Sequence, residues 1–471
     1  MILDVTPTDK PVPAVRPKAV LVVLSAAAFM ASLDLFIVNV ALSDIGRDLG
    51  RGSLSDLSWV LNGYAIIYAA LLVPAGRLAD RFGRKSGFLL GLAVFVLASL
   101  GCALSGDLEV LVAFRLLQAA GAALLTPTSL GLLLAATPAD RRASAVRAWA
   151  ASGSLAAALG PVVGGLLVEA SWRWIFLVNL PFGLAAVVAA YLLVPDSDHD
   201  RGLLLPDLLG GLVLIVSVGA LATGLVKAPD WGWGSASTLG ALVLSAVALT
   251  AFLLRSARHP VPVVELRLLK HSSFAWSNVT ALLFSAAFAA NLLSFVLWME
   301  GVWHWSALRT GLGVAPGPLM VPVFAAIGHR LTQRFKVGHV TAAGSLLLGV
   351  GVVMILSSIG PTPSYAGDFL PGWLVGGIGV GLALPTVLSS ATTGLAPHQA
   401  STGSAIVNMS RQIGAVLGIS VLVAVLAVGD PVAAFRHAWW VITGLAVAGA
   451  IAALHTTPIS QPSPARGKDL S

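Results

Sequence analysis

The sequence is poor in charge. Only 10% of its 471 residues are Asp, Glu, Lys or Arg, whereas 57% are hydrophobic. A soluble domain carries about 25% charged residues, so the charges here are too few to cover the surface of a water-soluble enzyme of this length. The high apolar content also excludes a disordered chain. What remains is a protein that crosses a membrane many times.

Cysteine is nearly absent as well. Cys102 is the single cysteine, which excludes an internal disulfide and any metal site built from several cysteines. The nine histidines show neither an HExxH pair nor metal-ligand spacing. We therefore expect no metal, no cofactor and no enzymatic activity, because an enzyme needs acid, base or metal groups that converge. The net charge of +7 fits the positive-inside rule of membrane proteins better than a nucleic-acid partner.

Long uncharged stretches are the main positive feature. A helix needs about 20 apolar residues to cross about 30 Å of hydrocarbon. The uncharged stretches predict an all-α protein with fourteen membrane-spanning helices, at 19–42, 57–75, 86–105, 109–133, 147–168, 174–194, 207–228, 237–255, 275–298, 309–329, 338–358, 369–392, 402–427 and 437–456.

The basic residues predict the orientation. An even number of spans puts both termini on one side, and the segments on that side hold roughly a threefold excess of Lys and Arg over the segments opposite. We therefore expect both termini in the cytoplasm of a bacterial cell and the spans in its plasma membrane. The first span is too long for a cleavable signal, so we expect it to be retained.

A short repeat divides the chain into halves. The segments 77–82 (RLADRF) and 330–335 (RLTQRF) follow the second and tenth spans, which is the pattern of transporters built from parallel repeats. We predict two six-helix bundles separated by two extra central helices. The expected divisions are a cytoplasmic tail 1–18, a bundle 19–195, a linker with two spans 196–274, a bundle 275–456 and a tail 457–471.

A carboxylate and a guanidinium are expected to meet inside the first bundle. Asp34 lies about 22 Å from the inner face and Arg115 about 9 Å from the outer face, so the two share one depth. Burying the carboxylate costs about 2.5–3.5 kcal/mol, which a pair would offset. Gln118 lies one turn from Arg115 and can bind either partner. The group either couples a proton to conformation or is a fixed structural pair.

A second guanidinium lies near mid-membrane in span 13. Arg411 cannot shed its proton, so it must face a cavity, helix-end carbonyls or an anion, unless it serves helix packing alone. We assign Arg411, Asn408 and, in the first span, Asn39 to the lining of a substrate cavity. Away from their ends, the predicted spans hold one acid and two bases, with no acid in the C-terminal half.

Two small-residue motifs complete the pattern. The turn after span 2 is either a basic anchor or a conformational latch, because its first glycine permits close helix approach and its acid can favour a neighbouring helix N-terminus. Its residues are Gly76, Asp80, Arg81, Gly83 and Arg84. Span 5 carries small residues four apart and a proline that can kink the helix. These are Gly160, Pro161, Gly164 and Gly165.

Together these motifs resemble the major facilitator superfamily, and within it the 14-helix drug:proton antiporters of multidrug and antibiotic efflux. The segment 76–85 is similar to the signature between helices 2 and 3, and 33–42 to the helix-1 signature of drug antiporters. The segment 115–123 resembles the helix-4 motif implicated in proton coupling, and 160–165 the helix-5 motif of antiporters. The segments 172–176 and 179–181 resemble the 14-helix subgroup.

The chain departs from the helix-1 pattern at two positions. Phe36 stands where the family usually has Thr, and Ser43 where it usually has Pro. Ala119 and Ala156 replace glycines usual in helices 4 and 5. We expect these changes to alter local helix packing and the shape of the site, so the substrate range of the family does not transfer.

The resemblance implies a monomeric exporter that works by alternating access and is driven by protons. The charge inventory favours a neutral, weakly acidic or zwitterionic amphiphile, such as an antibiotic-like natural product, over a dication. Two alternatives remain open: a proton-coupled importer of a small metabolite, and a membrane sensor that transports nothing. The helix-5 motif argues against the importer. The short cytoplasmic segments, which leave no room for an output domain, argue against the sensor.

Overall fold

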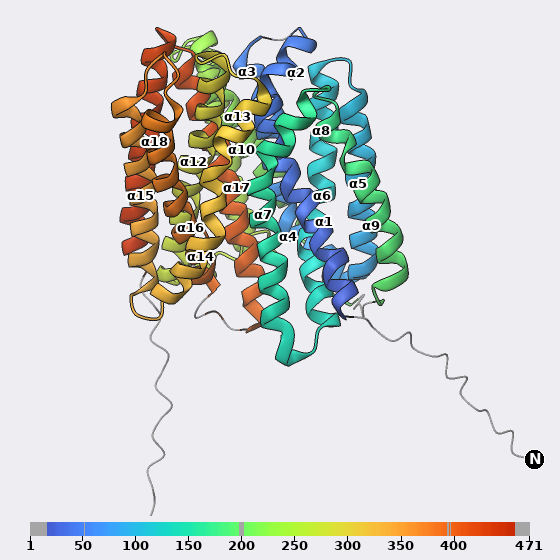
Figure 1. The fold of residues 1–471 in the computed structure, drawn as a ribbon. Coiled ribbons are helices and arrows are strands. Elements are labelled where there is room, and N and C mark those ends of the chain that lie inside the picture. The colour runs from blue at the N-terminus through green and yellow to red at the C-terminus, as the bar shows by residue number, and fades with distance from the viewer. Residues whose placement is uncertain (1–16, 51, 197–201, 393–394, 396, 457–471) are drawn as a thin grey trace, which may run out of the picture.

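The computed structural model describes residues 17–50, 52–196, 202–392, 395 and 397–456. These residues form helices and turns without a β-strand, and fourteen helical segments are long and apolar enough to cross a membrane. Figure 1 shows them standing side by side as one upright bundle. In hydrocarbon every backbone N–H and C=O must be paired within the helix itself, which is why the uncharged stretches fold this way. The predicted class, an all-α protein with fourteen spans, is confirmed.

The first six spans are formed by the helices of the N-terminal half. They are α1 (Pro17–Ile37), continued by a 3₁₀ turn η1 (Val38–Ala41) and α2 (Leu42–Asp48); α3 (Leu54–Leu57) with α4 (Trp59–Phe82); α5 (Arg84–Leu104); α6 (Leu108–Ala136); α7 (Arg142–Val168), after the 3₁₀ turn η2 (Ala139–Arg141); and α8 (Trp174–Leu177) with α9 (Asn179–Leu193).

The last eight spans are formed by the helices from α10 to α18. They are α10 (Leu208–Trp231); α11 (Ala236–Arg258), followed by η3 (Leu268–Lys270); α12 (Ser272–Gly301); α13 (Ala307–Val314) with α14 (Pro316–Leu331); α15 (Val337–Ser358); the π-helical turn η4 (Tyr365–Phe369) with α16 (Leu370–Thr392); α17 (Pro397–Leu426); and α18 (Pro431–Leu454).

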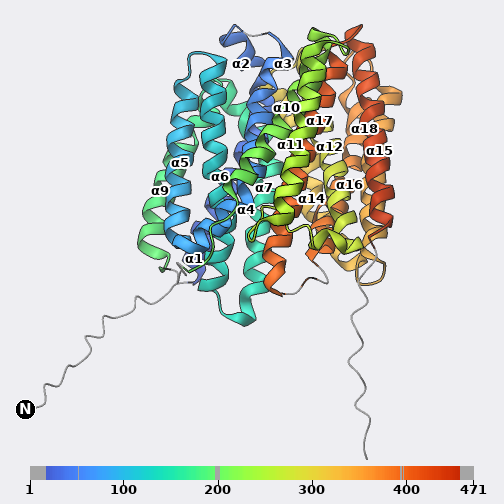
Figure 2. The ribbon, with the colours of Figure 1, turned by 180° about the vertical axis from the view of Figure 1, so that it is seen from behind.

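The helices gather into two groups joined by a helical hairpin. In the first group α1 packs against α6, α7 and α9, and α6 also contacts α4 and α5. In the second group α12 packs against α17 and α18, while α15 contacts α16 and α18. The hairpin is α10 with α11, and α10 lies against α4 of one group and α17 of the other. Figure 2 shows this hairpin in green between the two groups.

The bundle has two ends, which we name from what they carry. The first residue of α1 and the last residue of α18 lie at the same end, here called the termini end. The short helices α2 and α3 lie at the opposite end, here called the α2 end (Figures 1 and 2). The predicted tails 1–18 and 457–471 lie almost wholly outside the described residues, as does part of the linker 196–274.

Several helices run further than the predicted spans. The span of α12 was expected to stop at residue 298, but the helix continues to Gly301 and includes Glu300. The inference that the spans of the C-terminal half hold no acid is therefore wrong. Helix α4 likewise continues to Phe82, where Gly83 adopts a φ of +107° and ends it. A charge stops an uncharged stretch, but it does not stop a helix whose end reaches the polar interface.

The two groups of helices touch closely near the α2 end. A Cβ atom on Gly165 of α7 would lie 2.5 Å from the backbone oxygen of Ala307 in α13. Gly311 of α13 contacts the Pro161 carbonyl just as closely. Nearer the termini end, Leu155 of α7 and Val323 of α14 are about half exposed. The direct contacts of α7 with α13 therefore close the interface in the half of the molecule nearer the α2 end.

Candidate functional site

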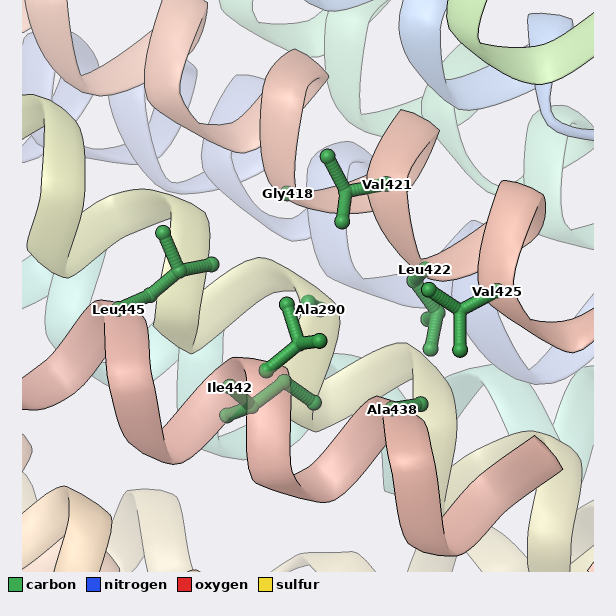
Figure 3. Close-up of a pocket in the computed structure, with 9 residues that line it drawn as sticks. Ala290, Gly418, Val421, Leu422, Val425, Ala438, Ile442 and Leu445 are labelled. Atoms are coloured by element: carbon green, nitrogen blue, oxygen red, sulfur yellow. The ribbon is translucent and has the colours of Figure 1, made fainter. Parts of the chain in front are cut away.

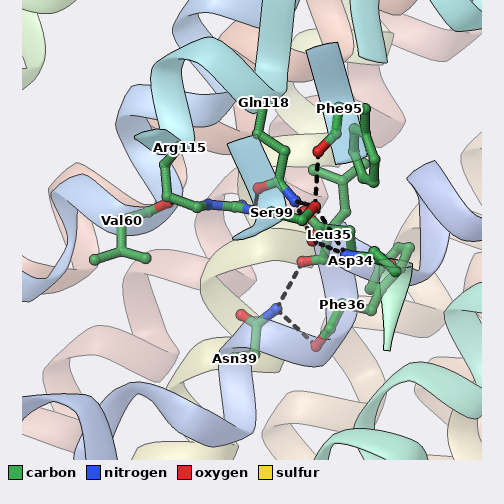
Figure 4. A network of polar contacts seen from close by, with 10 residues as sticks. Asp34, Leu35, Phe36, Asn39, Val60, Phe95, Ser99, Arg115 and Gln118 are labelled. Carbon is green, nitrogen blue, oxygen red and sulfur yellow. Dashed lines mark hydrogen bonds and ion pairs between the residues drawn. The ribbon is translucent and has the colours of Figure 1, made fainter. Parts of the chain in front are cut away.

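A charged pair is buried in the middle of the N-terminal group. Arg115 on α6 donates through Nη1 to Oδ2 of Asp34 on α1. Both residues are almost completely shielded, with 1% of Asp34 and none of Arg115 exposed. Figure 4 shows the two side chains pointing toward one another between their helices. The structure thus brings together the acid and the base that the sequence placed at one depth.

Neutral donors surround the same carboxylate. Gln118 Nε2 donates to Asp34 Oδ1 at 2.9 Å, and Asn179 Nδ2 donates to the same oxygen at 3.1 Å. Gln118 also accepts from Arg115 Nη1 at 2.6 Å. Ser99 Oγ accepts from Gln118 and Asn179 and donates to the Phe95 carbonyl. The Asp34 cluster therefore consists of Asp34, Arg115, Gln118, Asn179 and Ser99, drawn from four spans.

The guanidinium is held on its other side as well. Arg115 Nε donates to the Val60 carbonyl of α4 at 3.2 Å. The ring of Tyr64 lies under the guanidinium, 4.2 Å from its carbon to the ring centroid, a distance at which a cation is attracted to the ring face. Tyr64 is itself fully buried. The cation thus binds to α1, α4 and α6 at once, so these helices share one electrostatic centre.

The charges of the Asp34 cluster balance while Asp34 is ionised. An ionised Asp34 accepts from three donors and balances the charge of Arg115, which offsets the burial of both ions. A protonated Asp34 would leave Arg115 as a buried, uncompensated charge, which is costly. Protonation must therefore be accompanied by a movement of Arg115 or by the arrival of water or an anion. That is the physical requirement for coupling a proton to conformation.

The three residues assigned to a substrate cavity lie apart from the Asp34 cluster. The amide of Asn39 donates to the Leu35 and Phe36 carbonyls of its own helix, at 3.1 and 3.2 Å, where α1 passes into η1 (Figure 4). Arg411 on α17 donates to Asn408 Oδ1 one turn away at 3.1 Å. The structure therefore joins Arg411 to Asn408 and places Asn39 elsewhere, engaged with its own backbone.

Arg411 has no carboxylate partner among the described residues. Its Nε is shielded from solvent and makes no hydrogen bond within the described part of the chain. Tyr68 of α4 is the titratable side chain that interacts electrostatically with the Arg411 guanidinium. The Tyr68 hydroxyl lies 2.9 Å from Thr126 Oγ1 of α6. Arg411 is thus a partly buried cation on α17 that faces the N-terminal group, and its shielded Nε is left without an acceptor.

At the end of α4, Asp80 pairs with Arg84, the first residue of α5, and two arginines reach the segments that flank the hairpin. Asp80 accepts from Arg84 at 2.7 Å, and Arg81 donates to the Leu203 carbonyl. Arg77, in the same turn of α4, pairs with Glu265 at 2.7 Å. Gly76 lies where a Cβ would be 3.2 Å from Pro127, so it does permit the close approach of α4 and α6. The turn ties α4 to the segments that flank α10 and α11.

The glycines of the motif in span 5, which is α7, pack against two different partners. Cβ atoms on Gly160 and Gly164 would collide with Phe36, Val40 and the Ile37 carbonyl of the first span. Gly165 and Pro161 meet α13, as described above. The motif therefore sits where α7 contacts α1 on one side and the C-terminal group on the other.

Sequence reasoning missed two members of the Asp34 cluster. Asn179 belongs to the segment 179–181 that resembles the 14-helix subgroup, and its position at the start of α9 could have suggested a role. Ser99 gives no signal, because one serine in an apolar helix is common. Glu300 was missed because its helix was ended too early.

The apolar crevice in the C-terminal group does not form part of this site. It is lined by aliphatic residues of α12, α17 and α18, among them Ala290, Leu422 and Ile442, and is too narrow for a water molecule (Figure 3). Across the part of the chain that the structure describes, there is no group of three His, Cys, Asp or Glu side chains that could hold a metal ion.

The chain is similar to several curated proteins over most of its length. It is 34% identical to a methylenomycin A resistance protein of Streptomyces coelicolor, covering 87% of this chain and 86% of that one. It is 31% identical to a tetracenomycin C resistance and export protein of Streptomyces glaucescens, covering 88% and 77%. It is 34% identical to the multidrug resistance protein Stp of Mycobacterium tuberculosis, covering 85% and 74%.

Solved structures share the fold at low identity. A POT family transporter in complex with a thioalcohol-conjugated peptide aligns with a TM-score of 0.69 and 15% identity, covering 92% of this chain and 94% of that one. Another in complex with 5-aminolevulinic acid gives 0.68 and 16% over the same shares. Residues 24–419 match the Major Facilitator Superfamily. The chain therefore belongs to the major facilitator superfamily, as its motifs predicted.

Proposed function

We propose that this membrane transporter is a proton-driven exporter of amphiphilic small molecules. The relatives named above are resistance and export proteins that cover most of the chain, and they favour export over import. The observation that carries the mechanism is the buried Asp34 cluster, which holds an acid–base pair inside one six-helix group. The importer is not favoured, and the family does not consist of enzymes.

In the proposed cycle Asp34 carries the proton. When Asp34 is ionised it binds Arg115 and Gln118, as in this structure. A proton that reaches Asp34 from outside removes the charge that balances Arg115, and α1, α4 and α6 must then rearrange. Inward proton movement supplies about 2.3 kcal/mol per 100 mV and about 1.4 kcal/mol per pH unit. One proton therefore supports an export gradient of roughly a few hundredfold at most.

The proposed orientation places the termini end in the cytoplasm and the α2 end outside. The basic excess predicted from the sequence lies in segments of the termini end, among them the turn with Arg77 and Arg81 and the segment with Arg330 and Arg334. In this orientation the contacts of α7 with α13 close the outer side. The bacterial relatives support a plasma-membrane location, and we propose a monomer.

The proposed substrate is neutral, weakly acidic or zwitterionic. Arg411 is a partly buried cation without a carboxylate partner in the described residues, and it faces α4 beside Asn408. Like charges at such a site would repel a dication, whereas a carboxylate, phenolate or carbonyl oxygen would satisfy the unused donors. Asn39 contributes less to this proposal, because its amide is bound to its own helix.

The mechanism is tested by proton release. Purified protein in weakly buffered detergent should release protons when substrate is added, and Asp34→Asn should abolish the release while the chain still elutes as one folded species. Asp48→Asn is the matched control, because it removes a half-exposed carboxylate from the same span. Coupled transport that survives Asp34→Asn unchanged would remove Asp34 from the mechanism.

The substrate class is tested separately in proteoliposomes. An imposed proton gradient should drive transport of neutral or weakly acidic amphiphiles in preference to dicationic antiseptics of similar size. Arg411→Gln should weaken transport of the acidic compounds more than that of the neutral ones. A preference for dications in the unaltered protein would contradict the proposed class.

A further inference from the structure

Two residues that depart from the helix-1 pattern face the C-terminal group. Phe36 contacts Phe288 of α12 edge to face, with ring centroids 6.5 Å apart. Ser43 Oγ donates to Oε2 of Glu300 on α12 at 2.6 Å. The family usually has Thr and Pro at these two positions, neither of which can make the contact seen here. The first span of this chain therefore carries its own means of binding α12 near the α2 end.

Glu300 is an acid in an unfavourable place for a charge. Its Oε2 accepts from Ser43, while its Oε1 is shielded from solvent and has no hydrogen-bond partner among the described residues. An ionised carboxylate offers about four acceptor sites to hydrogen-bond donors. Burying one of its oxygens without a donor carries a large free-energy cost. A neutral carboxylic acid at the same position costs much less.

The charged neighbours of Glu300 do not offset this cost. The charged groups that interact electrostatically with Glu300 are Asp44 and Arg47 of α2. These two pair with each other, and Arg47 is 75% exposed, so its charge is spent on Asp44 and screened by water. Glu169, at the end of α7, bears on Asp44 and adds negative charge to the region. A negative Glu300 would thus face carboxylates with little compensation.

We propose that Glu300 and Ser43 form a proton-dependent lock between the two helix groups at the α2 end. Glu300 is neutral while the lock is closed and held by Ser43. When the groups separate, Ser43 withdraws, water reaches the carboxyl group, and Glu300 loses its proton to the solution at that end. Closure takes the proton back from the same solution, so the lock adds no proton to the number transported.

The lock gives the outer solution control over one step of transport. This reading rests on the proposed function and orientation, which put the α2 end outside. Acidic conditions outside then favour closure of the outer side by up to tenfold per pH unit, the limit for a single proton. The return of the emptied exporter would be fastest where external protons are available to drive it.

The experiment measures closure directly and does not depend on transport. Cysteines replace Gly106 and Gly360, which follow α5 and α15 at the α2 end, because a Cβ added at either position would have no other atom within 4 Å. Cys102 is buried and is replaced by Ala. Spin labels on the full chain in lipid nanodiscs report the distance between the two helix groups at pH values from 5 to 8.

The expected result is a longer label distance at higher pH. In Glu300→Gln, which mimics the neutral acid, the slope of log(closed/open) against pH should fall by up to one. Ser43→Ala keeps the carboxyl group but removes its hydrogen bond, so it should reduce the closed-to-open ratio about fivefold. Asp48→Asn is the matched control, since it removes a carboxylate of α2 that bonds to Trp172 and Arg173 instead of the lock, and it should keep the slope of the unaltered protein.

The proposal is overturned if Glu300→Gln keeps the original slope, or if Ser43→Ala leaves the closed fraction unchanged. Thermal unfolding of each variant checks that it is folded. The outcome is separable from the proposed function. Proton-driven export could fail in proteoliposomes while the distances still respond to pH through Glu300, or export could be present while Glu300→Gln has no effect on closure.

Discussion

Asp34 is stabilised by the number of donors around it rather than by Arg115 alone. An isolated pair in the interior often fails to recover its desolvation cost, but here Gln118 and Asn179 supply further hydrogen bonds to the carboxylate. The carboxylate is therefore held by neutral residues on α6 and α9 as well as by the charge on Arg115.

We predict the effect of Asn179→Leu from this set of hydrogen bonds. The substitution removes one donor to the ionised Asp34 while keeping the branched heavy-atom shape of the side chain. A hydrogen bond to a charged group contributes about 1.5 kcal/mol or more, so proton release on substrate addition should move to higher pH by about one unit. The measurement is the midpoint of that release.

Thr128→Val is the control for this prediction. Thr128 is also buried and lies on α6 with Arg115, but it bonds only to carbonyls of its own helix. In Thr128→Val the midpoint pH of proton release should not move. Equal shifts in the two variants would mean that packing, not donation to Asp34, sets the midpoint.

At the scale of elements, the close packing of α7 with α13 holds the two helix groups together near the α2 end. Its backbones approach closely because Gly165 and Gly311 have no side chain between them. A helix pair of this kind separates or closes as a rigid unit, since close-packed interfaces do not deform gradually. The small residues of α7 and α13 therefore favour the conformation in which the two helix groups are in contact at the α2 end.

Gly165→Ala should open the α2 end. Its Cβ would meet the backbone of Ala307 at 2.5 Å, and backbone cannot move aside cheaply. Overpacking costs about 1–3 kcal/mol, so the closed-to-open ratio should fall about tenfold in the spin-label measurement. Gly153→Ala on the same helix is the control, because its nearest atom is Ser32 Oγ at 3.6 Å, and a fall of equal size there would refute the argument.

At the scale of the whole molecule, the hairpin of α10 and α11 bridges the two helix groups. Asp207 caps α10 through the Gly210 N–H and pairs with Arg255 of α11 at 2.7 Å, which fixes the hairpin at its base. Arg77 and Glu265 then join that base to α4. The hairpin is thus bound to the N-terminal group at the termini end, and α10 also contacts α17 of the C-terminal group.

The orientation of the whole molecule is open to a simple test. Gly106→Cys lies at the α2 end and Gln333→Cys at the termini end, and both positions are exposed. The positive-inside rule predicts that a membrane-impermeant maleimide labels the first and not the second in intact cells. Labelling of Gln333→Cys alone would reverse the orientation.

The sequence by itself determined the number of spans and the shared depth of Asp34 and Arg115. These follow from uncharged length and from the fixed rise of a helix, which are local properties. The superfamily motifs also lie in continuous segments, so they could be read without a structure.

Only the tertiary structure decided which side chains meet. Whether Ser99 and Asn179 reach Asp34, whether Asn39 turns back to its own helix, and whether Ser43 binds Glu300 all depend on how each helix is rotated and packed against its neighbours. The same holds for the shielding of Glu300, because the end of an uncharged stretch does not mark the end of α12. Contacts between helices are long-range in sequence, so no local pattern encodes them.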